Sequence, residues 1–363
     1  MHLKNFLNLC KRLHTSNCLA MPATIERTTI QDIARELDLN ASTVSRALNN
    51  HQSISAATKE RVSFVAKRLK YHPNKIASSL RLGKSQIIGV IIPSAEINFF
   101  GSVVHGIEKV AAEKNFNVLI YQSNELMMAE KKGIITFLRS RVDGILASIA
   151  KETTSLEHFR EIKKMKVPLV LFDRANDDLT VPSVVIDDYM GAYNATLHLI
   201  EQGCKRIAHI SGQQHVAIFK KRLEGYTDAL IFNGFDIDED LVKYGTVTIE
   251  SGRSCMNDLL ALANPPDGVF AVEDFTALGA LQALKNAHIK IPEEVAVIGF
   301  ANEAFGEFIT PSLSTVDQQT KRMGEEAARC FFDLLEKNKF YNEPVEKRIL
   351  EPQLIFRESS LRN

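Results

Sequence analysis

The sequence predicts two folds joined in one chain of 363 residues: an all-α headpiece and, after it, a larger α/β core. Apolar residues recur at helical spacing in three short stretches between residues 29 and 71. From Ile87 onward, short apolar runs alternate with amphipathic stretches in two cycles, which is typical of parallel sheets covered by helices. The balance of positive and negative residues also changes between the headpiece and the core. Residues 22–84 hold 11 Lys or Arg against 5 Asp or Glu, whereas residues 85–363 hold 30 against 39.

The first 27 residues belong to neither predicted fold. A secretory signal needs an unbroken apolar run of roughly 7 to 15 residues. Four polar residues interrupt the run here: Asn5, Asn8, Lys11 and Arg12. We favour a disordered extension, upstream of a start at Met21, over the alternative of a short amphipathic helix.

Three short helices with a small common core are predicted for the headpiece. Thr29 is placed to cap the first helix, with Asp32 completing a capping box, and "DLN" ends it. Asn40 is placed to cap a second helix, which runs to about Leu48. A third helix begins at Ser55 and stops before His72-Pro73, because the residue before a proline disfavours helix.

The second helix carries small polar side chains where a core-forming helix would carry Leu or Met. A face made of Ser42, Thr43, Ser45 and Arg46 is thin enough to enter the major groove of DNA. There an arginine can bond O6 and N7 of guanine, and serine or threonine can contact bases or phosphates. The alternative is a surface helix of a small helical bundle. The basic headpiece on an acidic chain favours DNA.

The core is predicted to contain two doubly wound halves. Strand-like runs in the first half include "IIGVIIP", "FNVLIYQ", "GILAS" and "VPLVLFD". The second half has "SVVIDD", "RIAHIS", "LVKYGTV", "GVFAV" and "VAVIGF". No G-x-G-x-x-G or G-x-x-x-x-G-K-[ST] motif follows the first strand of either half, which argues against nucleotide binding.

Several stretches along the sequence resemble a known family. "TIQDIARELDLNASTVSRALNN", "SRVDGILAS", "HLIEQGCKRIAHISG", "RLEGYTDAL" and "IPEEVAVIGFANE" are similar to the lac repressor/galactose repressor family of bacterial transcription regulators. The resemblance implies a helix-turn-helix headpiece and a core like that of periplasmic binding proteins. It also implies a cytoplasmic homodimeric repressor that binds a palindromic operator in double-stranded DNA. A small-molecule effector, a sugar or sugar derivative by family default, would control that affinity, without cofactor, metal or membrane.

The resemblance assigns roles in DNA binding to particular residues. Base-reading positions fall on Ala41, Ser42 and Arg46, and some members place another at Ser53. Positions that cap a helix or contact the DNA backbone fall on Thr29, Asn40, Thr43, Ser45 and Asn49. One departure is Asp38, where many members have Gly. We expect the turn to survive, since Asp tolerates a left-handed conformation better than most residues.

The linker "NKIASSLRLGKSQ" lacks the apolar surface for a core of its own. In the family such a linker folds into a hinge helix on operator DNA, and a leucine wedge opens a central base step. That leucine falls on Leu80, with Asn74 at the helix start and Ala77 on the DNA side. The alternative for Leu80 is packing on the core.

Ligands of open α/β sheets bind beyond the carboxyl ends of the strands. Carboxylates, an arginine and a stacking aromatic ring at those ends suit a polyhydroxylated ligand. By family position, the effector-binding residues are Phe100, Asp173, Arg222, Glu273, Asp274 and Asn302. Alternatives stay open, because Asp173, Asp187 and Asp274 could cap helices and Phe100 could be partly core. The pocket also departs from the family at "HVAIFKK" and at Asn302, so no relative supplies the effector.

The expected domain plan follows from these assignments. It comprises an extension (1–27), a helix-turn-helix domain (28–73), a hinge helix or linker (74–84) and an effector-binding and dimerisation core (85–363). Within the core, subdomain 1 is expected at about 85–186 and 317–344, and subdomain 2 at about 187–312 and 345–363. No long C-terminal heptad repeat follows, which favours a dimer over a tetramer.

Two other classes of protein compete with this interpretation. A free periplasmic-type binding protein would need an export signal and no basic headpiece. An enzyme would need a catalytic or metal-binding cluster, but the histidines are scattered, and we expect His198 and His209 on helix and strand surfaces. The five cysteines form no C-x-x-C pair, which indicates reduced thiols.

Overall fold

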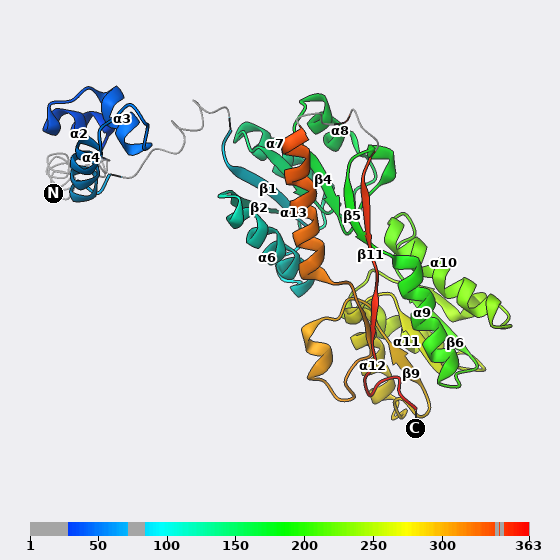
Figure 1. The fold of residues 1–363 in the computed structure, drawn as a ribbon. Helices are drawn as coiled ribbons and strands as arrows, with labels where there is room; N and C mark the ends of the chain where they lie inside the picture. The colour runs from blue at the N-terminus through cyan, green and yellow to red at the C-terminus, as the bar shows by residue number, and fades with distance from the viewer. Residues whose placement is uncertain (1–27, 72–83, 338–340, 342–344, 363) are drawn as a thin grey trace, which may run out of the picture. The chain divides into compact units, whose positions relative to one another are not determined.

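The computed structural model describes residues 28–71, 84–337, 341 and 345–362. Figure 1 shows the chain, which divides into two compact units, residues 1–81 and 82–363. The extension and the three linker residues predicted to contact DNA, Asn74, Ala77 and Leu80, lie outside the described residues.

The headpiece consists of α2 (Ile30–Leu37), α3 (Ala41–Leu48) and α4 (Ala56–Arg68), which confirms the three predicted helices. Each contributes a fully buried aliphatic side chain to one core, namely Ile33, Val44 and Val62. The predicted capping box is present. The Asp32 carboxylate accepts hydrogen bonds from the Thr29 N–H at 2.8 Å and from its hydroxyl at 2.7 Å.

The turn between α2 and α3 uses the expected left-handed residue. Asp38 has φ 53° and ψ 47°, and the Leu39 N–H donates to the Ala34 carbonyl oxygen at 2.9 Å. Asn40 does occupy the position before α3, but its side chain makes no capping hydrogen bond there. Only the expected position is therefore confirmed for Asn40, and the expected side-chain cap is wrong.

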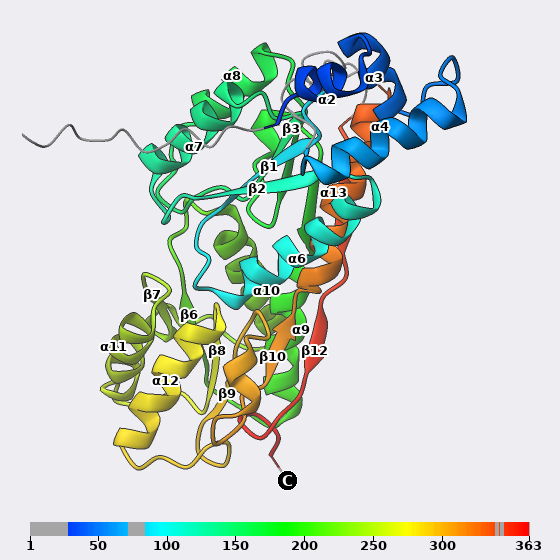
Figure 2. The same cartoon turned by 90° about the vertical axis from the view of Figure 1, so that its left-hand side faces the viewer.

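The first half of the core is built on a six-stranded parallel sheet in the order β11-β5-β4-β3-β1-β2. The strands are β1 (Ile87–Ile92), β2 (Asn117–Gln122), β3 (Gly144–Ala147), β4 (Leu169–Phe172), β5 (Ser183–Ile186) and β11 (Lys347–Leu350). The helices are α6 (Asn98–Glu113), α7 (Met127–Arg139), α8 (Glu157–Lys164) and α13 (Thr320–Lys337). Figure 2 shows α6 and α13 on one face of the sheet and α7 and α8 on the other.

Alternation along β1 explains this three-layer packing. Ile88, Val90 and Ile92 join the core cluster with α6 and α13, whereas Ile91 joins the one with α7 and α8. Successive side chains of a strand point to opposite faces, so a continuous apolar run is what a sheet covered on both sides requires.

The end of the first half differs from the expected boundary at residue 345. β11 pairs in parallel with β5, with Ile349 opposite Val185, so residues 347–350 belong to the first sheet. The expected assignment of this segment to subdomain 2 is wrong, because the chain adds an edge strand to the first sheet before it crosses to the second half.

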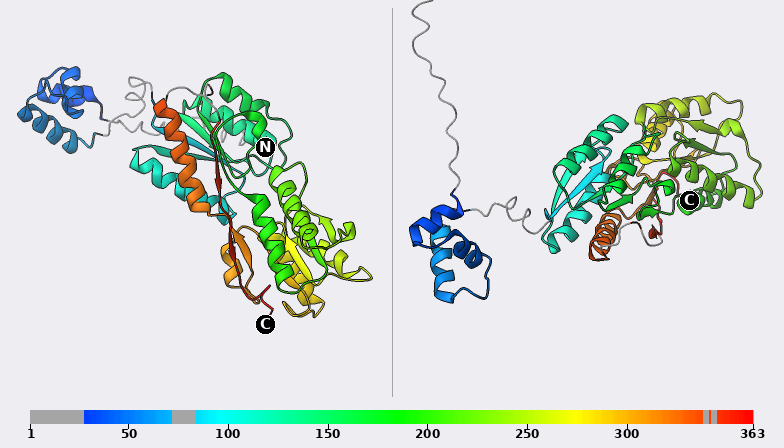
Figure 3. Two further views of the ribbon diagram at one scale, coloured as in Figure 1. Left: turned by 45° about the vertical axis from the view of Figure 1, so that its right-hand side comes forward. Right: turned by 90° about the horizontal axis from the view of Figure 1, so that it is seen from above.

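The second half has a four-stranded parallel sheet in the order β7-β6-β8-β9. Its strands are β6 (Ile207–Ser211), β7 (Val242–Tyr244), β8 (Gly268–Ala271) and β9 (Ala296–Ile298), so the run "LVKYGTV" yields a strand of only three residues. The helices are α9 (Asp188–Glu201), α10 (Ala217–Phe232), α11 (Ile249–Leu260) and α12 (Asp274–Asn286). The second half also contains η2 (Glu239–Leu241), η3 (Ala304–Glu307) and an antiparallel pair, β10 (Thr315–Asp317) with β12 (Gln353–Ile355), whereas η1 (Asp177–Leu179) lies between β4 and β5 of the first half. Figure 3 shows the two halves as distinct α/β bodies.

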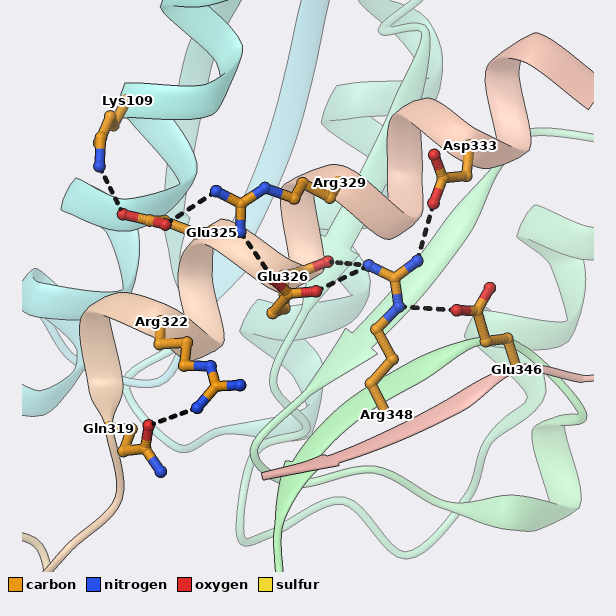
Figure 4. Close-up of polar contacts among 9 residues, drawn as sticks. All are labelled: Lys109, Gln319, Arg322, Glu325, Glu326, Arg329, Asp333, Glu346 and Arg348. Carbon is orange, nitrogen blue, oxygen red and sulfur yellow. Dashed lines mark hydrogen bonds and ion pairs between the residues drawn. The ribbon is translucent and has the colours of Figure 1, made fainter. Parts of the chain in front are cut away.

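Helices α6 and α13 approach each other closely through two glycines. A Cβ atom at Gly106 would collide with the carbonyl oxygen of Lys321, and one at Gly324 would collide with that of Val103. An ion pair at the surface adds to this contact: Glu325 of α13 accepts from Lys109 of α6 at 2.8 Å (Figure 4). A second pair joins α13 to the edge strand, with Arg348 of β11 donating to Asp333 at 2.7 Å. Such exposed pairs contribute about 0 to 1 kcal/mol each, so packing holds the helices together.

Two histidines expected on surfaces are buried instead. His209 on β6 is fully buried between the rings of Tyr226 and Phe270, and its Nδ1 donates to the Phe270 carbonyl oxygen at 2.9 Å. His198 on α9 hydrogen-bonds with the Ser360 hydroxyl at 2.7 Å. Burial lowers the pKa of each to about 4, so both are neutral at pH 7. Within the described residues, no helix is both long and apolar enough to cross a membrane.

Candidate DNA-binding and effector sites

Helix α3 presents the polar face that the sequence predicts. Val44 and Ala47 are buried, whereas Ala41, Ser42 and Arg46 are exposed. Within the described residues the Arg46 side chain makes no hydrogen bond or ion pair, so its guanidinium is available to an external acceptor.

Three of the remaining headpiece candidates make local side-chain contacts. The Asn49 amide donates to the Ser45 carbonyl oxygen at 2.7 Å, and the Ser53 hydroxyl is bonded to His51 Nδ1 at 2.8 Å. Thr29 is bonded to Asp32 at the start of α2. Thr43 and Ser45 are half-buried on α3. The Thr29 contact lies at the start of α2, and the Asn49 contact lies at the end of α3.

A cavity of about 70 Å³ lies between the two halves of the core. Four of the six effector candidates line it: Phe100 from α6, Asp173 after β4, Arg222 from α10 and Glu273 after β8. The parallel sheets bring them together, because the carboxyl ends of their strands face the same cleft.

Arg222 lies in the wall of the cavity that the second half of the core contributes, and it makes several contacts there. Its side chain is buried, its Nε donates to Asp188 Oδ1 at 2.8 Å, and its Nη1 donates to the Val272 carbonyl oxygen at 2.7 Å. The guanidinium carbon lies 3.6 Å from the centre of the Phe300 ring. Burial raises the pKa of Asp188 to about 6, against the opposing effect of Arg222. Most of the hydrogen-bonding capacity of Arg222 is therefore used inside the protein.

Two carboxyl groups line the cavity, those of Asp173 and Glu273. Asp173 is buried in a left-handed conformation (φ 59°), and its Oδ2 accepts from the Ser148 hydroxyl at 3.0 Å. Burial raises the pKa of Asp173. Burial, followed by the charges of Asp274 and Glu303, raises the pKa of Glu273 to about 8.

The raised pKa of Glu273 predicts that Glu273→Gln and the parent chain differ in their free energy of unfolding, by an amount that depends on pH. Because the folded state holds the proton up to about pH 8 and the unfolded state releases it near 4.5, Glu273 costs increasing stability between those values. Glu273→Gln removes that cost. We expect it to be more stable than the parent, by a margin that grows from pH 5 to pH 8, in urea unfolding monitored by circular dichroism. A stability difference that stays constant between pH 5 and pH 8 would contradict the raised pKa of Glu273.

Two effector candidates are not brought into the cavity. Asp274 is buried, with its carboxylate accepting from the Glu303 N–H and the Thr315 hydroxyl, both at 2.7 Å. The Asn302 side chain donates to Asp317 at 3.3 Å and accepts from Arg357 at 3.0 Å. Both side chains join segments of the second half and neither lines the cavity in this structure, so the effector contact expected for each stays a prediction. The alternative that Asp187 caps a helix is confirmed, since it accepts from the Met190 N–H at 3.0 Å.

The predicted set of effector residues lacked several side chains that line the cavity. Lys151 follows β3, Gln318 follows β10, and Phe219 and Phe275 belong to α10 and α12. Ala301, with φ 126°, takes the place at the wall that was expected for Asn302. Polar residues just after "GILAS" and "LSTVD" would have indicated Lys151 and Gln318, because both follow buried strands.

Comparisons with known proteins match both the headpiece and the core to known families. Residues 29–74 match the model of the lacI family of bacterial regulatory proteins, and residues 196–360 match a periplasmic binding protein-like domain. The chain is 34% identical over 310 residues to the HTH-type transcriptional repressor CytR of Escherichia coli strain K12. That alignment covers 85% of this chain and 90% of the repressor. The chain belongs to the lacI family of bacterial regulatory proteins.

Membership of the lacI family makes the chain a DNA-binding transcription regulator and confirms the family expected from the sequence. The HTH-type transcriptional regulator RegA of Clostridium saccharobutylicum is 31% identical over 92% of this chain and 99% of its own length. The relatives are regulators, which is consistent with a protein that is not an enzyme.

Solved structures support the same fold. The transcriptional regulator CelR in complex with cellobiose aligns with a TM-score of 0.70 and 29% identity, over 92% of this chain and all (100%) of that chain. The lac repressor dimer bound to operator aligns with a TM-score of 0.83, over 93% and 100%. Because the lac repressor is only 22% identical to this chain, the similarity between them concerns the fold alone. It confirms a helix-turn-helix headpiece followed by an α/β core.

Proposed function

We propose that this lacI-family regulator is a cytoplasmic homodimeric repressor that binds a palindromic operator. A sugar or sugar derivative in the core cavity controls its affinity for DNA. The observation that carries the DNA-binding part is the face of α3, where exposed Ala41, Ser42 and Arg46 stand on a helix held by a buried core. Such a face reads base edges in the major groove. The linker residues Asn74, Ala77 and Leu80 remain proposed DNA contacts on the family resemblance.

Exposed apolar side chains on the core support a dimer. β2 is an edge strand of the first sheet, and on it Leu119 and Ile120 are 41% and 49% exposed. Phe308, just after η3, is 82% exposed. Unpaired edges and exposed apolar groups are the surfaces that partner subunits cover. A two-fold symmetric dimer matches a palindromic site, because each headpiece meets one half-site.

The cavity suits a polyhydroxylated effector. Its walls combine carboxyl groups, cations and an amide with the rings of Phe100, Phe219 and Phe275. Charged groups bond hydroxyls, and aromatic rings cover the apolar face of a sugar. Two related structures carry sugars, cellobiose in CelR and ribose in an Enterococcus faecium regulator. Because a site for such ligands usually has about 300 Å³ or more, the core has to open to admit one.

Control of DNA binding follows from coupling between the two sites. If the effector changes operator affinity by some factor, operator DNA changes effector affinity by the same factor. Melting temperatures measured with a panel of sugars, followed by operator titrations with and without the sugar that binds, test this part of the proposal. A sugar that binds the core and leaves operator affinity unchanged would contradict it.

Arg46→Ala is expected to lower operator affinity by about 1 to 3 kcal/mol, because one bidentate base contact is worth that much. The operator is first defined by incubating the full chain with genomic fragments and sequencing those retained. Affinity is then measured for the operator and for random duplex across a series of salt concentrations. Arg46→Ala should reduce the ratio of the two affinities.

Lys70→Ala is the matched control, since it removes one exposed positive charge from the same headpiece. Loss of a phosphate contact weakens binding to every sequence alike, so the control should leave the ratio unchanged. Retention of no common palindrome, or operator affinity that does not respond to salt, would contradict the assignment of α3.

A further inference from the structure

Glu125 lies just behind the wall of the core cavity that contains Lys151 and Arg174. We propose that Glu125 makes this cavity selective for uncharged, hydroxylated ligands over phosphorylated ones, by neutralising both cations from outside the cavity. The inference rests on the proposed function, because it concerns the cavity that we assign to the effector. Glu125 is a positioning residue in this account, since it does not line the cavity itself.

The contacts of Glu125 occupy both cations. The Arg174 Nη1 donates to the two carboxylate oxygens at 3.0 and 2.8 Å. The backbone N–H of Lys151 donates to Oε2 at 2.8 Å, and the Lys151 ammonium lies 3.6 Å from Oε1. Burial alone would raise the pKa of Glu125, but Arg174 and Lys151 lower it below its ordinary value. The carboxylate is therefore charged at pH 7.

The backbone places Glu125 at some energetic cost. Asn124 and Glu125 have φ values of 52° and 62°, so two consecutive residues other than glycine are left-handed. Strain of this kind persists where surrounding contacts compensate for it, and it is concentrated at functional sites. Here the four contacts to Arg174 and Lys151 provide that compensation.

The opposite wall is balanced in the same way. Arg222 is paired with buried Asp188 at 2.7 Å. The remaining acidic groups on the walls, Asp173 and Glu273, add no positive charge for an anion to pair with. A phosphate group entering the cavity would meet no cation without a carboxylate partner, and the desolvation of an unpaired anion is costly.

Two polar groups of the cavity that lack hydrogen-bond partners suit the hydroxyl groups of a ligand. The Arg174 Nε–H is buried without a hydrogen-bond acceptor among the described residues. The Glu273 side chain likewise makes no hydrogen bond within the part of the chain that the structure describes. Single donors and acceptors of this kind, beside the ring of Phe100 at 5.6 Å from the Arg174 guanidinium, match an uncharged sugar ring.

Glu125→Gln in the full chain tests the inference, with inorganic sulfate as the probe. The amide keeps the shape of the side chain and removes its charge. Lys151 then loses its ion-pair partner, whereas Arg174 keeps the Asp173 carboxylate, 3.8 Å from its Nε. We expect sulfate affinity, measured by isothermal titration calorimetry at fixed ionic strength, to rise at least about tenfold over the parent. Adding Lys151→Met to Glu125→Gln should abolish the gain, which places the sulfate at this wall.

Glu157→Gln is the matched control, because it removes one exposed carboxylate, paired with Arg160 on α8, from the same half of the core. It should bind sulfate like the parent. Equal sulfate affinity for Glu125→Gln and Glu157→Gln would overturn the inference, and so would a gain that survives Lys151→Met. Glu125→Ala carries the same expectation and is titrated in parallel, so the test does not depend on one variant folding.

The outcome separates this inference from the proposed function. If the parent responds to sugars but Glu125→Gln gains no sulfate affinity, the role of Glu125 is wrong and the effector site stands. If Glu125→Gln gains sulfate affinity and no sugar changes operator binding by the parent, the effector assignment is wrong and the charge balance of the cavity stands.

Discussion

Arg222→Met is expected to lower the free energy of unfolding of the core by about 3 to 5 kcal/mol. Methionine has a similar length but leaves Asp188, only 3% exposed, without its counter-ion. The Val272 carbonyl oxygen also loses its donor. A buried charge without a partner costs more than the volume change, so electrostatics decides the size of the effect. Urea unfolding of the full chain at pH 7, followed by circular dichroism, measures it.

Two further variants identify the cause of that loss. Lys221→Met changes the neighbouring, exposed position on α10 and should shift stability by less than about 0.5 kcal/mol. Combining Arg222→Met with Asp188→Asn removes both charges, and most of the lost stability should return. If Arg222→Met alone unfolds like the parent, or if the double variant is no more stable than Arg222→Met, the buried ion pair does not anchor this wall.

Local patterns were sufficient to predict the headpiece. Ile33, Val44 and Val62 recur at helical spacing, and each lies in the core of the structure. The capping box at Thr29 depends on residues three apart, so it too could be predicted from the sequence. The missing side-chain cap at Asn40 could not, because the choice between capping and pointing outward depends on a rotamer and not on residue type.

Non-local pairing limited the prediction of the core. Alternating apolar and amphipathic stretches predict strands and helices, but β11 takes its place in the first sheet through pairing with β5, more than a hundred residues earlier. His209 was expected at the surface of a strand. It lies in β6, which has neighbours on both sides and is covered on both faces, and such strands bury every side chain.

For the candidate effector site, the sequence predicted which strand ends meet but did not predict which individual side chains enter the cavity. Parallel topology predicts that residues after strands meet at one cleft, and Asp173 and Glu273 do so. Asp274 and Asn302 are sequence neighbours of cavity residues, but adjacent side chains at a strand end point in different directions. Glu125 could not be found from sequence, because its role depends on two left-handed residues and on cations from other loops.

Ile33→Ala is expected to abolish binding to all DNA sequences by unfolding the headpiece. Removing a fully buried isoleucine costs about 2 to 5 kcal/mol. A domain of this size has a total stability of only about 2 to 7 kcal/mol, at roughly 0.05 to 0.15 kcal/mol per residue. Because the core is a separate compact unit, its melting temperature should not change. Calorimetry of the full chain and binding to random duplex measure the two effects.

Phe64→Ala is the control for that loss, because it removes a larger apolar side chain from α4 that is 68% exposed. It should shift headpiece stability by less than about 0.5 kcal/mol and leave DNA binding intact. The pattern differs from that of Arg46→Ala, which should weaken the operator more than random duplex. If Ile33→Ala still binds random duplex like the parent, the small core around Ile33 does not hold α3 in place, and the DNA-binding face must be supported in another way.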